Sequence, residues 1–313
     1  MTETDKPASF DDGTSSRKHA EGLWRVAIRR LFRQRSGILG MILLGILVLL
    51  AIFAPLIAPY DPIEVLIGKE DVRKRDPPCI HLLGCPEDQP QHIMGIDGNV
   101  RDEFSRILYG TRISLTVGFA TIGLAILVGA SLGAIAGYAG GTTSDVIMRI
   151  LDVVLAFPFL LLAIAIVAVL GPGLINAMLA IAIVNIPVYA RVMRSSVLSV
   201  KEEEYVVAAR SIGSKPFRIL SLHILPNSVP PLIVAATLGI ATAILETAAL
   251  SFLGMGAQPP QPEWGAMLAG ERNQVFSAPH LVFFPGLAIM ITVLGFNLLG
   301  DGLRDALDPR LRL

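Results

Sequence analysis

Apolar residues in this chain gather into long runs, and polar or charged stretches separate one run from the next. A helix needs about 20 predominantly apolar residues to cross the hydrocarbon core of a bilayer. The pattern predicts six such helices, at 37–58, 113–138, 146–171, 174–190, 229–253 and 280–300. The fourth run is interrupted by Asn185 and Pro187, so its limits are soft. We therefore predict an all-α integral membrane protein.

Composition supports this interpretation. Hydrophobic residues make up 53% of the sequence and charged residues only 17%, whereas soluble domains carry roughly a quarter charged residues. The 26 basic and 26 acidic residues balance, so no bulk attraction to nucleic acid is expected. The high hydrophobic content makes membrane lipid the expected surroundings of the chain. The first 36 residues are polar and then basic, and the run after them is too long for a cleaved signal peptide.

Basic residues predict the orientation, because loops rich in Lys and Arg stay in the cytoplasm. They flank the first run, follow the fourth and end the chain, at Arg25, Arg29, Arg30, Arg33, Arg35, Arg191, Arg194, Lys201, Arg210, Lys215, Arg218, Arg304, Arg310 and Arg312. We expect both termini inside, with cytoplasmic tails at 1–36 and 301–313. The 59–112 segment also carries basic residues, but long loops translocate largely regardless of charge, so we place it outside.

The loop at 195–227 predicts two short helices joined at a glycine. Gly213 stands where a glycine ends a helix, Ser214 can cap the next one and Pro216 suits its first turn. We expect this second helix to stop after Leu225, before Pro226. Asn227 or Ser228 would then cap the fifth transmembrane helix.

Ala209 and Gly213 are four residues apart, which would place them on one helix face with a shallow notch between larger side chains. Such a notch suits docking of a cytoplasmic partner. An ordinary pair of surface helices with a glycine turn explains the same spacing.

Polar or helix-bending residues inside apolar runs mark candidate positions along a transport pathway. These are Phe157, Pro158, Asn185 and Glu246. Glu246 has an alternative interpretation, as a carboxylate that hydrogen-bonds a neighbouring helix for packing. Asp145, Arg149 and Asp152 have the spacing of an ion-pair ladder that anchors the third span.

Two features are expected on the outer side. Trp264, Met267 and Leu268 have helical spacing, so they form either a substrate-contacting surface at the outer face or an interfacial anchor. Cys79 and Cys85 lie in the long outer loop, where an oxidising compartment favours a disulfide. His81 and His92 lie nearby, but their spacing matches no standard zinc pattern, so we predict no metal site.

Several segments resemble the dipeptide/oligopeptide branch of the ATP-binding-cassette importer permeases. Ala208-Ala209-x3-Gly213 with Leu225-Pro226 resembles their "EAA" loop, although Val207 stands where Glu is usual and His223 where Ile is usual. Further blocks resemble the same branch from about residue 24 onward, starting at Gly95, Arg101, Glu246, Gln258 and Phe296. Residues 65–91 look like an insertion.

The resemblance implies a type I importer permease with a core of five helices at 113–300. It implies a coupling loop to partner ATPases that includes Tyr205, Ala208, Ala209, Gly213, Leu225 and Pro226. The chain has no Gly-x4-Gly-Lys-[Ser/Thr] phosphate loop, so we expect no enzyme activity, with ATP and Mg on the ATPases. The other implied partners are a second, related permease in a heterodimer and an external substrate-binding protein.

Peptides are the substrates that this branch implies, with nickel, glutathione and oligosaccharides as alternatives. An ion-coupled secondary transporter would instead need ionisable coupling groups inside the spans, for which Glu246 and Asp152 are the candidates. An intramembrane enzyme would need a nucleophile and base, or metal ligands, on facing spans. The five histidines lie outside the span interiors, and no such set is visible.

Overall fold

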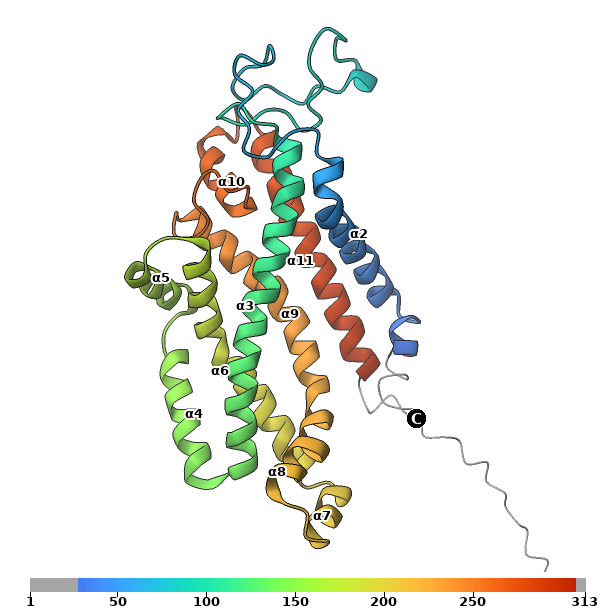
Figure 1. The fold of residues 1–313 in the computed structure, drawn as a ribbon, viewed down its shortest axis with the longest axis vertical. Helices are drawn as coiled ribbons and strands as arrows, with labels where there is room; N and C mark the ends of the chain where they lie inside the picture. The colour runs from blue at the N-terminus through green and yellow to red at the C-terminus, as the bar shows by residue number, and fades with distance from the viewer. Residues whose placement is uncertain (1–27, 308–313) are drawn as a thin grey trace, which may run out of the picture.

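The computed structural model describes residues 28–307, which form a bundle of long helices with an irregular cap at one end (Figure 1). The long helices are α2 (Arg35–Ile57), α3 (Glu103–Ala139), α6 (Leu174–Lys201), α9 (Leu225–Phe252) and α11 (His280–Leu307). The shorter ones are α4 (Gly141–Leu155), α5 (Phe159–Leu170), α7 (Glu204–Ser211), α8 (Pro216–Arg218) and α10 (Trp264–Glu271). Single turns lie at His81–Leu83 and Arg272–Gln274.

The third predicted span is not one straight helix. It divides into α4 and α5, which meet at an angle of 88°. Pro158 lies at the break, because a proline lacks the amide hydrogen of a helix interior and disfavours helical backbone in the residue before it. The predicted bend at Phe157-Pro158 is therefore confirmed. The described residues contain five helices long and apolar enough to cross a membrane, or six candidate spans when the bent pair counts as one.

Several helices extend beyond the apolar runs that predicted them. α3 begins at Glu103 rather than near 113, because the Asp102 side chain caps it by accepting a hydrogen bond from the Ser105 amide at 2.7 Å. α6 continues to Lys201 and α11 to Leu307. Part of the predicted outer loop 59–112 and part of the predicted tail 301–313 are therefore helical. Residues 1–27 and 308–313 of the predicted tails, with Arg25, Arg310 and Arg312, lie outside the described residues.

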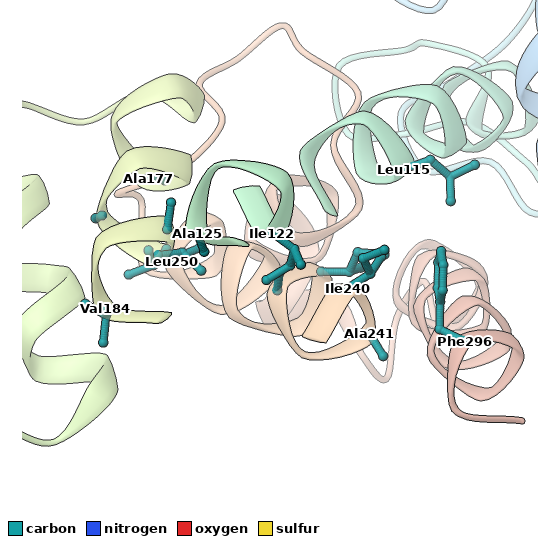
Figure 2. Packing of buried hydrophobic residues seen from close by; sticks show 14 of the residues in the cluster. Leu115, Ile122, Ala125, Ala177, Val184, Ile240, Ala241, Leu250 and Phe296 are labelled. Carbon is teal, nitrogen blue, oxygen red and sulfur yellow. The ribbon is translucent and has the colours of Figure 1, made fainter. Parts of the chain in front are cut away.

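The core forms where α3, α6 and α9 pack together. Gly129, Gly133 and Gly137 recur every four residues along α3 and face α6. A Cβ atom added at Gly129 or Gly133 would lie 2.5 Å from the Ile186 carbonyl oxygen or 2.3 Å from that of Ala190, so only glycine permits this approach. Branched and small side chains fill the space beside this contact (Figure 2).

The two ends of the bundle differ. One end, here the α7 end, carries α7 and α8 on the loop between α6 and α9; the other, the α10 end, carries α10 and the 58–102 segment (Figure 1). The first residues of α2 and the last of α11 both point toward the α7 end (Figure 1). The described parts of the chain thus begin and finish on the same side of the bundle.

Candidate functional site

The turn after α7 has the geometry that the sequence predicts. Gly213 has a left-handed backbone, with φ of 82°. Its amide donates to the Arg210 carbonyl at 3.0 Å, and the Ser214 amide donates to the Ala209 carbonyl at 3.2 Å. These two bonds are the glycine-ended Schellman arrangement, which satisfies carbonyls at the end of a helix. The predicted role of Gly213 as helix terminator is confirmed.

The predicted notch between Ala209 and Gly213 is wrong. α7 ends at Ser211, so Gly213 lies beyond the helix and cannot share a face with Ala209. Ala209 is only 7% exposed, whereas Ala208 and Tyr205 are exposed on the other side of α7. Ala209 therefore packs toward the bundle and is not one side of an exposed notch with Gly213.

The predicted helix break before Pro226 is also wrong. Residues Ile219–Ile224 form a π-helical stretch, and Leu225 and Pro226 are the first residues of α9. The Leu225 amide donates to the Leu220 carbonyl, one residue further back than in an α-helix. This wider turn lets the chain continue through the proline, which a regular α-helix resists. Asn227 is not a cap: its side-chain amide donates to the His223 carbonyl at 2.8 Å.

Two large apolar side chains that the sequence analysis did not single out stand beside the glycine turn. Ile212 is 84% exposed and Phe217 is 81% exposed. Val206 and Ile219, from the same loop, are buried in a small core that includes Met193 and Val197 of α6. That core fixes the loop to the bundle, and the turn presents Ile212 and Phe217 outward. Apolar residues next to a helix-ending glycine are the sequence signal for such a surface.

The candidate pathway residues come together only in part. The Asn185 side-chain amide donates to a Glu246 carboxylate oxygen at 3.3 Å, which joins α6 to α9, and also to the Ile181 carbonyl at 3.0 Å. This contact matches the packing interpretation of Glu246. Phe157 and Pro158 lie instead at the exposed α4–α5 break. A pathway role for these four residues stays a prediction.

The predicted ladder of Asp145, Arg149 and Asp152 does not form. Asp152 pairs with Arg191 of α6, and within residues 28–307 no ion pair joins Arg149 to either aspartate. The carboxylate therefore ties α4 to a neighbouring helix and not to the next turn of its own helix.

Trp264 and Met267 belong to α10, as their spacing predicts, but they face the protein. Trp264 is fully buried, and its indole nitrogen donates to the Ile107 carbonyl of α3 at 3.2 Å. Met267 is buried beside it, and Leu268 is partly buried. Trp264 thus contacts neither solvent nor lipid headgroups, because the 254–263 loop and α3 enclose it. A substrate-contacting role for the segment stays a prediction, with Leu268 as its more accessible member.

The cap at the α10 end is held by polar contacts. Cys79 and Cys85 form a disulfide, as predicted. His92 is buried between two carboxylates: one ring nitrogen contacts Asp102 at 2.8 Å and the other contacts Glu70 at 3.1 Å. Burial alone lowers the pKa of His92, but hydrogen bonds and charge from Asp102 and Glu70 outweigh it and raise that pKa. The cluster joins residue 70, within the predicted insertion, to Asp102, the N-cap of α3.

A second set of contacts ties this cap to α10. Arg75 pairs with Glu271 at 2.8 Å, and the Gly98 amide donates to the same carboxylate at 3.0 Å. Arg106 donates to the Pro62 carbonyl at 2.8 Å and to the Pro260 carbonyl at 3.3 Å. Segments far apart in the sequence thus form one polar layer over the bundle. Within the described residues, no group of three or more His, Cys, Asp or Glu side chains could hold a metal ion.

The described residues form a bundle of candidate membrane spans with one broken span, an exposed apolar turn at one end and a polar cap at the other, and the class of protein follows from comparison with known families. Residues 129–313 match the family described as "binding-protein-dependent transport system inner membrane component", and residues 22–78 match the "N-terminal TM domain of oligopeptide transport permease C". The chain belongs to the binding-protein-dependent transport permeases, a family of multi-pass inner-membrane proteins and not of enzymes.

Individual relatives agree with this assignment. A dipeptide transport system permease protein of Alkalihalophilus pseudofirmus is 50% identical over 92% of this chain and 90% of its own length. A glutathione transport system permease protein of Pectobacterium atrosepticum is 45% identical over 92% of each chain. A permease chain from inward-facing structures of the MetNI methionine ABC transporter has a TM-score of 0.55 at 19% identity, covering 64% of this chain and 96% of that one. This last likeness shows the type I importer fold.

Proposed function

We propose that this chain forms half of the translocation pathway of an ATP-driven importer that takes up di- or oligopeptides. A related permease completes the pathway in a heterodimer, an external binding protein delivers the peptide, and two partner ATPases bind ATP and Mg. In this proposal the α7 end faces the cytoplasm and the α10 end faces outward. The family membership supports the binding-protein-dependent class, and the dipeptide relative supports the substrate.

The observation that carries the coupling proposal is the exposed apolar turn between α7 and α8. Ile212 and Phe217 are almost fully exposed beside Gly213, while the buried side of the loop packs on α6. A rigid loop with protruding apolar side chains can occupy a groove on a partner and transmit its movement to α6 and α9. The coupling residues are then Ile212, Gly213 and Phe217, together with Tyr205 and Ala208, which are also exposed on this loop.

The test is a Gly213→Trp variant in the complete importer. Glycine has the freedom to adopt φ of 82°, whereas tryptophan strains that turn and adds bulk where nothing lies within 4 Å of a Cβ atom. We expect the variant to remain in the membrane and to lose peptide uptake while ATP hydrolysis continues uncoupled. Normal uptake would overturn the coupling proposal.

Gly84→Trp is the matched control. Gly84 also has a left-handed backbone and open space around it, but it belongs to the 58–102 segment, which forms the cap at the α10 end. The control introduces the same kind of backbone strain and the same side-chain volume. If the Gly84→Trp importer still couples ATP hydrolysis to peptide uptake, the effect of Gly213→Trp is due to its position between α7 and α8.

The glutathione relative favours one alternative substrate, which is itself a small peptide. Proteoliposomes holding the purified importer separate the two possibilities: dipeptides, longer peptides or glutathione are added with the binding protein, and stimulated ATP hydrolysis is measured. Stimulation by glutathione alone would exclude the dipeptide proposal. Uptake that stops when an ion gradient collapses while ATP remains would favour an ion-coupled transporter.

A further inference from the structure

A groove of about 670 Å³ runs between α2 and α3 on the outside of the bundle. Val48, Ala51 and Ile52 of α2 form one wall, and the other is formed by α3 through Leu115, Thr116, Phe119 and Ala120. The lining residues of α3 recur every three or four positions, so they form one stripe along the helix. Both helices are candidate membrane spans, and therefore the groove opens toward lipid chains.

Arg112 lines the same groove. Its side chain is exposed, and within residues 28–307 its guanidinium has neither an acidic partner nor a hydrogen-bond acceptor. The hydroxyl of Thr116, one turn further along, donates to the Arg112 backbone carbonyl at 2.7 Å and so does not compete for the guanidinium. An arginine at the edge of a membrane extends its guanidinium into the headgroup region, where a lipid phosphate can accept its hydrogen bonds.

The charge lies at one end of the groove. α3 runs away from the α10 end (Figure 1), so Arg112 precedes the rest of the α3 wall on that side. Phe119 is seven residues further along, about 10 Å deeper at 1.5 Å per residue. This order, a cation near the surface and then an apolar channel toward the bilayer centre, matches a phospholipid with its phosphate outward and one acyl chain inward.

We infer that the groove between α2 and α3 binds one anionic phospholipid from the leaflet at the α10 end. Arg112 contacts its phosphate, and the walls from Val48 to Phe119 hold an acyl chain. The lipid covers apolar surface that both helices otherwise leave open: Ile52 is 61% exposed and Phe119 is 53% exposed. A bound lipid of this kind adds to the direct packing of α2 on α3 in the core that includes Ala51 and Leu115.

The experiment is native mass spectrometry of the full-length protein, purified in a neutral detergent and titrated with phosphatidylglycerol or with zwitterionic phosphatidylcholine. We expect one tightly retained phosphatidylglycerol. Arg112→Gln removes one interfacial charge contact of about 1 kcal/mol, so affinity falls about fivefold. Arg112→Lys keeps the charge and most of the affinity. Arg149→Gln is the matched control, since Arg149 is also an exposed arginine without an ion pair among the described residues but lines no such groove.

A groove-filling variant tests the acyl chain separately. Ala120→Trp places bulk in the groove, where the alanine is exposed, and should displace both lipids. Arg112→Gln should weaken phosphatidylglycerol more than phosphatidylcholine, because the choline cation offsets the phosphate charge in the latter. Equal retention by wild type and Arg112→Gln would overturn the inference. So would efficient cross-linking of a Phe119→Cys variant to the second permease in membranes, because a partner helix would then fill the groove.

Discussion

Gly110 shows how one residue fixes the position of α10 against α3. A Cβ atom added there would lie 2.6 Å from the Trp264 indole nitrogen and 2.7 Å from the Pro262 carbonyl oxygen. That nitrogen donates the buried hydrogen bond to Ile107, so it has little freedom to move. The absence of a side chain at Gly110 therefore allows the tryptophan to dock.

We expect Gly110→Ala to destabilise the protein by about 1–3 kcal/mol, the usual cost of overpacking a tight contact. The measurement is thermal unfolding of the detergent-purified protein, with size-exclusion chromatography of heated samples as the method that detects loss of folded protein. Gly123→Ala, on the same helix with open space around the added Cβ atom, should be neutral or slightly stabilising because alanine favours helix. Equal effects of the two substitutions would contradict the packing argument.

His92 is the second residue whose environment allows a prediction. Asp102 and Glu70 raise its pKa in the folded state above the ordinary value of 6.5, although burial opposes them. Protonated His92 therefore stabilises the fold fully below about pH 6.5, and this contribution is lost as the pH rises through the raised pKa. Tyr60 stacks on the imidazole ring and donates to Glu70 at 2.9 Å, which keeps that carboxylate in place.

The expected result is that wild type exceeds His92→Gln in melting temperature most clearly at acidic pH, and that the difference shrinks at alkaline pH. Melting curves of both proteins over a pH series provide the measurement. His81→Gln changes a histidine of the same cap outside this cluster and should show no such trend. A difference that grows with pH would show that the neutral form of His92 is the stabilising one.

At the scale of elements, the loop between α6 and α9 combines one predicted feature with one that was not predicted. The turn at Gly213 follows from local backbone preference. The unbroken passage through Pro226 depends on the π-helical stretch before it, and short sequence patterns do not distinguish such a stretch from a helix end. The break at Pro158 also has a local cause, the missing amide hydrogen, but Pro187 and Pro285 lie inside the unbroken helices α6 and α11, so a proline alone does not decide where a helix breaks.

Phe217→Ser tests this element without disturbing its fold. Phe217 is 81% exposed, so the substitution should change the free energy of unfolding by less than about 0.5 kcal/mol. If the side chain anchors an ATPase, the affinity between the subunits should fall about tenfold or more, the scale of a binding hot spot. Co-purification of the ATPase and ATP-driven uptake are the two measurements.

Phe276→Ser is the control, because Phe276 is fully exposed in the 254–279 loop toward the opposite end of the bundle. Equal loss of ATPase binding in both variants would mean that exposed phenylalanines act nonspecifically. Unchanged binding in Phe217→Ser would exclude Phe217 as an anchor.

For the whole molecule, orientation is the main prediction. The described chain begins and finishes toward the α7 end (Figure 1), and basic residues concentrate on that side. We expect the α7 end in the cytoplasm. In a background with Cys79→Ser and Cys85→Ser, a membrane-impermeant maleimide should label a Phe276→Cys variant in intact cells. It should label Phe217→Cys only after the cells are opened, and the reverse pattern would invert the topology.

The sequence alone determined what depends on local composition: the membrane location, the approximate spans, the bend at Pro158 and the turn at Gly213. Hydropathy, a missing amide hydrogen and a left-handed backbone act within a few residues, so they can be identified along the chain. The motifs between 95 and 310 also sufficed to indicate the transport family.

Only the tertiary structure decided which distant groups meet. Asp152 pairs with Arg191 of α6 and not with Arg149 of its own helix. The Asn185 side-chain amide donates to Glu246, and the buried Trp264 indole donates to the Ile107 carbonyl. Each outcome depends on how closely two helices approach and on which faces they present. That approach depends on glycines such as Gly133, whose effect appears only when the neighbouring backbone is in place.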